Sequence, residues 1–214
     1  MPVLIYNQIN DITAKLIKMG LAVQQNFPTI QNGKIAYSGI QDLSIALKDI
    51  AYEHIYNTLD TAKNYNIKMV DGSLIQMMYS FDREEITSHR LAFFPSPSLE
   101  SFQNEPELYE DDELYADVLA KNLVTSPLRF DFDSDLEKFV EIHHPQSHMT
   151  VGQYKNCRIP VSEPLTPDVF ISFLLQSFYN TTYRRYSDDF TIGNCRFPHT
   201  ITNNEKNILH VGRY

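Results

Sequence analysis

The chain has 214 residues, of which 43% are hydrophobic and 21% are charged, and its formal net charge is −9. This length and composition are typical of one globular domain and exclude a disordered or fibrous chain. The negative charge disfavours a broad nucleic-acid-binding surface, because such binding relies on lysine and arginine to displace counterions. Any contact with nucleic acid is therefore expected to be local.

The cellular location is predicted from cysteine content and hydropathy. Cys157 and Cys195 are too few and too far apart for a disulfide framework or a C-x-x-C pair, which favours a reducing compartment. The first residues show no basic region followed by an apolar core, so no secretory signal is expected. The longest apolar run, from Val169, has about half of the ~20 residues that a membrane span requires. We therefore expect a cytoplasmic protein outside the membrane.

The first third of the chain is predicted to be helical. Residues 10–23 carry apolar side chains at helical spacing. Residues 38–41, Ser-Gly-Ile-Gln, fit a capping box that opens a second helix, which is expected to end near residues 64–66. The stretch 26–33 contains a proline and an Asn-Gly pair and is expected to be a loop or a tight turn.

A sheet is predicted to begin after the Asp71-Gly72 turn. Two aromatic-rich runs, SLIQMMYSF and HRLAFF, flank a polar stretch and predict two antiparallel strands. Pro95 and Pro97 end the second strand, because proline cannot donate to a strand ladder. The run LRFDFD from Leu128 alternates strictly between apolar and polar residues, which predicts a strand with one buried face.

The segment 105–121 could form a short helix with many acidic side chains on one side. Charge runs of this kind usually form a solvated face. The alternative is that the acidic residues 105–117 bind a basic protein partner.

A late helix is predicted to begin at Thr166-Pro167-Asp168, which combines an N-cap hydroxyl, a proline at the first helical position and an acid in the first turn. It is expected to end near Tyr179 and is apolar around most of its circumference, as is typical of a central helix. A short last strand is expected at 208–211.

Together these elements predict an α+β fold in a single domain, residues 1–214. Residues 1–68 are expected to be helical, 70–162 to be rich in strands, and 163–214 to hold the late helix and a tail. The sheet is expected to be mainly antiparallel, with the late helix buried on its apolar face.

The histidine-rich stretch FVEIHHPQSHMTVG, residues 139–152, predicts a β-hairpin that reverses near its centre. Side chains alternate along each strand, so the polar face of this hairpin pairs His143 with His148 and Glu141 with Thr150. The other face is apolar.

Placing the LRFDFD strand beside this hairpin, apolar face to apolar face, sets Arg129 beside His143 and Asp131 beside Glu141. Cross-strand neighbours lie ~5 Å apart, so these four side chains and His148 are expected to converge on one small ligand or ion. The two acids repel each other unless one is protonated, a cation separates them, or Arg129 balances them.

Three interpretations of this cluster remain open. It can be the solvated side of a sheet. It can be an acid–base centre, with His143 and His148 as acid and base and Arg129 stabilising developing negative charge, which suits phosphodiester cleavage without a metal. It can also hold a divalent metal such as zinc, manganese or iron on Asp131, Glu141 and one or both histidines.

Other motifs are weaker. His144 is expected on the opposite face of the hairpin, where it packs against Pro145 or bonds to the backbone. The sequence contains no Gly-rich phosphate loop, no H-E-x-x-H and no G-x-S-x-G, which argues against P-loop, zincin and serine-hydrolase chemistry.

Several blocks of the sequence, above all RFDFD and HPQSH, resemble a bacterial family catalogued as domain of unknown function 2290. The resemblance covers nearly all of the chain beyond about residue 38. It implies a stand-alone cytosolic bacterial protein associated with anti-phage or toxin-like loci, and it transfers no activity.

The favoured function is a phosphodiester-acting hydrolase, ribonuclease-like or a toxin or effector. In it Asp131 and Glu141 orient the other groups or hold a divalent metal. The alternative is a non-enzymatic subunit of an anti-phage defence or regulatory complex, which binds its partner through residues 105–117.

Overall fold

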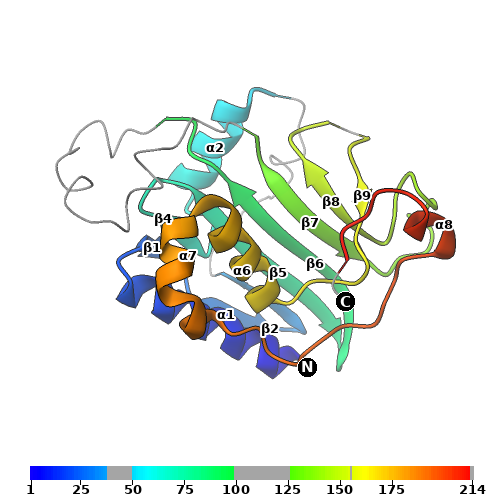
Figure 1. The fold of residues 1–214 in the computed structure, drawn as a ribbon, viewed down its shortest axis with the longest axis horizontal. Coiled ribbons are helices and arrows are strands. Elements are labelled where there is room, and N and C mark those ends of the chain that lie inside the picture. The colour runs from blue at the N-terminus through cyan, green and yellow to red at the C-terminus, as the bar shows by residue number, and fades with distance from the viewer. Residues whose placement is uncertain (38–49, 99–125, 155, 213–214) are drawn as a thin grey trace.

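The computed structural model describes residues 1–37, 50–98, 126–154 and 156–212, which form several helices and one large sheet (Figure 1). The helices are α1 (Pro2–Lys18), α2 (Tyr52–Thr61), α6 (Pro167–Phe178), α7 (Asn180–Tyr186), the short 3₁₀ helix η3 (Ser187–Phe190) and α8 (Asn203–Lys206). The strands are β1 (Ala22–Gln25), β2 (Pro28–Gln31), β3 (Lys34–Tyr37), β4 (Ile67–Met69), β5 (Leu74–Asp82), β6 (Glu85–Phe94), β7 (Leu128–Asp133), β8 (Ser147–Val151) and β9 (Ile159–Pro160).

The strands of the described ranges form one antiparallel sheet in the order β1-β4-β5-β6-β7-β8-β9, and β3 adds to β5 and carries β2. The long β5–β6 hairpin lies at the centre and turns at Arg83-Glu84, where Arg83 has a φ of 53°. Strand β6 ends at Phe94, directly before Pro95. The predicted α+β class, the central pair of strands and the proline stop are confirmed.

One face of the sheet is apolar and is covered by α1 and α6 (Figure 1). Phe130 of β7 contacts Phe170 and Phe173 of α6 edge to face, with ring centroids 6.0 and 5.6 Å apart. Phe93 of β6 stacks on Phe178, with a centroid distance of 4.8 Å. The strict alternation of β7 explains this packing, because every second side chain is apolar and projects toward the helix. The prediction of a central late helix on the apolar face is confirmed.

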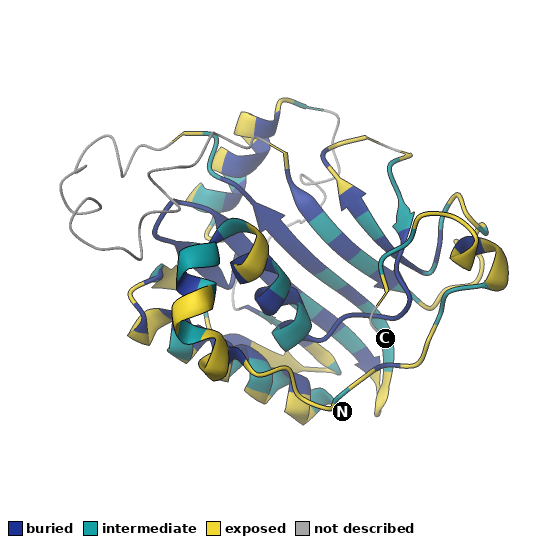
Figure 2. Ribbon diagram, in the orientation of Figure 1, coloured by how far each residue is buried: buried dark blue, intermediate teal, exposed yellow. Residues whose placement is uncertain are grey.

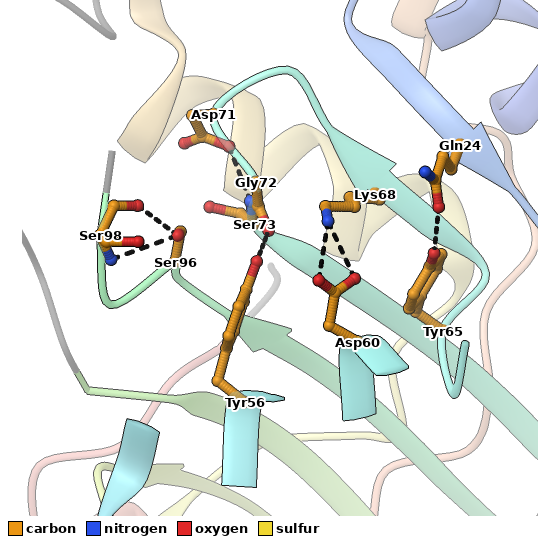
Figure 3. A network of polar contacts seen from close by, with 10 residues as sticks. All are labelled: Gln24, Tyr56, Asp60, Tyr65, Lys68, Asp71, Gly72, Ser73, Ser96 and Ser98. Atoms are coloured by element: carbon orange, nitrogen blue, oxygen red, sulfur yellow. Dashed lines mark hydrogen bonds and ion pairs between the residues drawn. The ribbon is translucent and has the colours of Figure 1, made fainter. Parts of the chain in front are cut away.

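Helix α2 covers one end of the opposite face. It packs there on Leu74, Ala92 and Phe94 in a second apolar cluster. Figure 3 shows how polar contacts fix this helix to the β4–β5 hairpin: the hydroxyl of Tyr56 donates to the carbonyl of Gly72 at 2.5 Å. The Nζ of Lys68 also lies 2.8 Å from a carboxylate oxygen of Asp60, which is on the turn of α2 that follows Tyr56. The remainder of this face, toward the β5–β6 turn, carries the pocket described below.

Residues 1–68 are not wholly helical, contrary to the prediction, because they also contribute β1 to β4. Helix α1 begins at Pro2 and ends at Lys18, before Gly20, whose φ of 71° is incompatible with continuing the helix. The predicted turn is present at Asn32-Gly33, where both residues have positive φ, but strands flank it on both sides. Strands of three or four residues are too short to show a period of two in the sequence.

Two predicted features lie in segments that the structure does not describe, and a third concerns the last residues of the chain. The capping box at 38–41 and the acidic segment 105–121 lie outside the described residues. The strand predicted at 208–211 does not form; among these residues there is one parallel bridge, from Val161 to Val211.

Figure 2 shows the central strands buried and α8 exposed. Of the helices in the described ranges, none combines the length and apolarity needed to cross a membrane.

Candidate functional site

Strand β8 pairs directly with β7, and not with residues 139–144 as predicted. Asp131 lies opposite His148, and Arg129 lies opposite Thr150. Cross-strand partners project from the same face of a sheet. Arg129, Asp131 and His148 therefore share the face opposite to α6.

Residues 134–146 form the β7–β8 connection, which consists of turns and one isolated bridge. Ile142 within it has a φ of 70°, in the left-handed region that β-branched residues rarely adopt. A residue in this conformation breaks the alternation of side chains that a strand requires. The predicted hairpin over 139–152 and the register of Glu141 and His143 are therefore wrong.

Glu141 and His143 lie apart from the other three predicted residues. The carboxylate of Glu141 accepts a hydrogen bond from Asn204 of α8 at 2.9 Å, and His143 is exposed to solvent. Glu141 does not sit beside Asp131, so the predicted like-charge pair does not form. Within the described ranges, no group of three or more His, Cys, Asp or Glu side chains is placed to hold a metal ion.

A pocket of about 670 Å³ opens on the polar face of β5 to β8. The β7–β8 connection forms one side of it, and the turn after β8 also contributes lining residues. Three of the five predicted site residues, Arg129, Asp131 and His148, line this pocket. His144, which was expected on the opposite face, lines it too. We call this site the polar pocket.

Asp131 is held between two arginines in the polar pocket. The Nε of Arg90 donates to Oδ1 of Asp131 at 3.0 Å, and the Nε of Arg129 lies 3.9 Å from Oδ2. Burial opposes the ionisation of Asp131, but the two guanidinium groups outweigh it and hold its pKa below the ordinary value. The carboxylate is therefore ionised at neutral pH, and the three residues together carry a net positive charge.

Arg129 retains an unused hydrogen-bond donor. Its Nη1 atom is buried and has no partner among the residues that the structure describes. Buried donors are almost always paired in proteins. Burial lowers the pKa of Arg129, but a guanidinium group stays cationic at neutral pH. Nη1 is thus a suitable donor to an anionic ligand oxygen.

His144 and His148 bring two imidazole rings together, with ring centroids 5.1 Å apart. Nδ1 of His148 lies 2.9 Å from the carbonyl oxygen of Pro145, and Nδ1 of His144 contacts the carbonyl oxygen of Lys138. Because a carbonyl oxygen can only accept, each Nδ1 is the donor and each Nε2 offers a lone pair in the neutral ring. Burial lowers the pKa of His148, which keeps this ring neutral at pH 7.

The pocket residues that the sequence prediction missed include Arg90, His144 and Arg158. Arg90 had a usable signal, because alternation along HRLAFF places it on the polar face, where it lies opposite Asp131. His144 and Arg158 had none, since both come from irregular connections without a repeating pattern. Periodicity therefore identifies the pocket residues that lie on strands and not those that lie on the connections between strands.

Comparison with family models matches residues 21–212 to a family described as "Uncharacterized conserved protein (DUF2290)". Comparisons with curated proteins and with solved structures returned no match. The matched range includes every residue of the polar pocket. The resemblance found in the RFDFD and HPQSH blocks is confirmed, and this chain belongs to the uncharacterised conserved family DUF2290.

Proposed function

We propose that this chain is a cytoplasmic phosphodiester-acting hydrolase of the ribonuclease type and that its reaction takes place in the polar pocket. The observation that supports the proposal is the pairing of His144 and His148 in the pocket that Arg129 also lines, where the buried Nη1 of Arg129 has no partner among the described residues. Two imidazoles can move the protons of a phosphoryl transfer, and an arginine can bind the phosphate oxygens.

His148 is suited to be the general base, because burial lowers its pKa and its Nδ1 is held by Pro145. In the proposed reaction its Nε2 takes the proton of a ribose 2′-hydroxyl, and the 2′-oxygen attacks phosphorus. The bond from phosphorus to the 5′-oxygen breaks, and protonated His144 gives its proton to that oxygen. The products are a 2′,3′-cyclic phosphate and a free 5′-hydroxyl.

His144 is assigned the acid role that His143 was expected to take. It lines the polar pocket, whereas His143 does not. Its side chain is partly exposed, so solvent can return the proton after each turnover. The 5.1 Å between the ring centroids of His144 and His148 lets one phosphate group lie within reach of both rings.

Arg129 and Arg158 supply positive charge where the transition state gains negative charge. Both line the polar pocket, and Arg129 is largely buried there, so its guanidinium is shielded from water. Preorganised donors of this kind act more strongly in a shielded site than in bulk water. Asp131 orients the Arg129 and Arg90 side chains and takes no part in proton transfer.

The first prediction tests the histidine pair on a short end-labelled RNA oligonucleotide in the presence of a chelator. His148→Ala and His144→Ala are each expected to lower kcat/KM by about 10²–10⁴-fold, the usual contribution of one acid or base. The wild-type rate is expected to rise with pH as His148 loses its proton, with a midpoint below 6.5.

The matched control is His143→Ala, which removes an exposed imidazole from the same connection and is expected to leave the rate unchanged. An oligonucleotide with a 2′-deoxy sugar at the cleaved position is expected to resist cleavage. Cleavage that persists in the folded His144→Ala, His148→Ala double variant, or a wild type that cleaves no RNA, would contradict the proposal.

A further inference from the structure

We infer that the polar pocket recognises an unpaired nucleic-acid strand and that Tyr154 holds one of its bases by stacking. The inference rests on the proposed function only in assuming that the bound strand is cleaved at a phosphodiester bond. The binding part is carried by separate observations in the turn between β8 and β9.

Tyr154 is a large aromatic side chain at the edge of the pocket. It lines the polar pocket, yet 77% of its surface is exposed. An aromatic ring in this position offers a flat apolar surface that a ligand inside the pocket can cover. Stacking on such rings is the usual way in which proteins bind unpaired bases, because every base has a flat face.

The ring of Tyr154 lies beside Gly152. Gly152 has a φ of 68°, and a Cβ atom at this position would lie 3.4 and 3.5 Å from Cδ2 and Cε2 of Tyr154. The ring therefore rests close to the Gly152 backbone, whose amide donates to the carbonyl of Pro127 at 2.7 Å.

A cation lies in the same turn. The backbone amide of Cys157 donates to the carbonyl of Tyr154 at 3.2 Å and closes the turn that leads to Arg158. Arg158 lines the polar pocket and makes no ion pair within the described part of the chain. A flat ring and a guanidinium group that line one pocket match a nucleotide, in which a base is linked through its sugar to a phosphate.

Pocket size and total charge select the form of nucleic acid. A volume of about 670 Å³ is that of a small-molecule site and accommodates only a short stretch of strand. The bases of a duplex are stacked on each other and do not present a free face. The net charge of −9 also disfavours contact with a long duplex. An unpaired strand fits the pocket volume, presents a free base face and needs no long contact with the acidic surface.

The test measures binding of the non-cleaving His148→Ala chain to three labelled probes by fluorescence anisotropy. The probes are a short single-stranded RNA, the same RNA in a duplex, and an abasic sugar-phosphate oligomer of equal length. The single strand is expected to bind about tenfold or more tightly than either of the others. Adding Tyr154→Ala is expected to weaken single-strand binding roughly 5- to 150-fold, whereas Tyr154→Phe keeps it within about twofold.

Phe27→Ala is the matched control, because Phe27 is an exposed aromatic residue that does not line the polar pocket. It is expected to leave the affinity unchanged. Cleavage assays use the chain that retains His148. In them, Tyr154→Ala is expected to raise KM with little change in kcat.

Two outcomes separate this inference from the proposed function. Equal binding of the abasic probe, or unchanged affinity after Tyr154→Ala, overturns the base-stacking role even if RNA is cleaved. A chain that binds the strand through Tyr154 and cleaves no RNA contradicts the hydrolase function and leaves the recognition role intact.

Discussion

His89 of β6 lies opposite Phe132 of β7 and also borders the polar pocket. Its Nε2 accepts a hydrogen bond from the backbone amide of Leu165 at 3.1 Å, and only 5% of its surface is exposed. Burial lowers the pKa of His89 from 6.5 to about 4. The ring is therefore neutral in the folded protein above about pH 4.

The second prediction follows from this pKa. Between pH 6.5 and about 4, the unfolded chain binds a proton at His89 and the folded chain does not. The contribution of His89 to the free energy of unfolding is therefore fully present above pH 6.5. The free energy of unfolding is expected to fall by on the order of 3 kcal/mol as the pH is lowered from 6.5 to about 4. His148, whose pKa is also lowered, contributes in the same direction. Urea denaturation followed by circular dichroism at a series of pH values measures the change.

His89→Gln preserves an acceptor for the Leu165 amide and removes the titration. Its unfolding free energy is expected to depend much less on pH in this window. His143→Gln, at an exposed position, is expected to keep the wild-type dependence. An equally steep loss of stability in the His89→Gln variant would contradict the assignment.

At the scale of elements, a buried carboxylate of α8 joins the Glu141–Asn204 bond in holding the β7–β8 connection to this helix. Glu205 accepts from the amide of Ile142 at 3.3 Å and from the amide of Thr202 at 2.9 Å, which completes the capping box of α8. The side chain that caps the helix therefore also anchors the connection that carries His144. Ile142, whose amide makes this bond, is also the residue with the left-handed backbone conformation.

The third prediction compares two glycine substitutions within the connection. A left-handed conformation costs an L-residue roughly 1–2 kcal/mol, and glycine is free of this cost. Ile142→Gly is therefore expected to be less destabilising than Val140→Gly by about 1–2 kcal/mol, because Val140 has no positive φ. Both residues are β-branched and partly exposed, so most other effects of glycine cancel. Equal losses in urea denaturation would show that Ile142 is unstrained.

At the scale of the whole molecule, a strongly acidic chain carries a locally cationic pocket. Lys138 pairs with Asp133 at 2.7 Å, and Arg90 pairs with Asp131 at 3.0 Å. Arg129 and Arg158 remain as the principal cations available to a phosphate. The rest of the surface is expected to repel a polyanion, which restricts binding to the pocket.

The fourth prediction uses the salt dependence of single-strand binding. Two phosphate contacts correspond to a slope of about −1.4 in a plot of log affinity against log salt concentration. Arg158→Ala is expected to make the slope shallower by about 0.7. Anisotropy titrations between about 50 and 200 mM salt measure both values. A slope steeper than about −4 would instead indicate a broad surface outside the polar pocket.

The elements that sequence reasoning predicted well have a strong local signal. Strand β7 alternates with a period of two, β5 and β6 are apolar, aromatic-rich runs around a polar stretch, and α6 begins at a proline after a threonine. The short strands β1 to β4 were missed, because three or four residues give no periodicity. The same contrast holds in the pocket, where Arg129 and Asp131 were placed together and Glu141 and His143 were misplaced.

The sequence by itself determined the fold class, the central helix, and the shared face of Arg129 and Asp131. Alternation is a steric property of any extended strand, so it can be read without knowing the neighbours. Only the tertiary structure decided that His148 pairs with Asp131 and that His144 joins it. The path of the β7–β8 connection depends on its bond to Glu205, more than 60 residues away, and no local pattern encodes a contact at that separation.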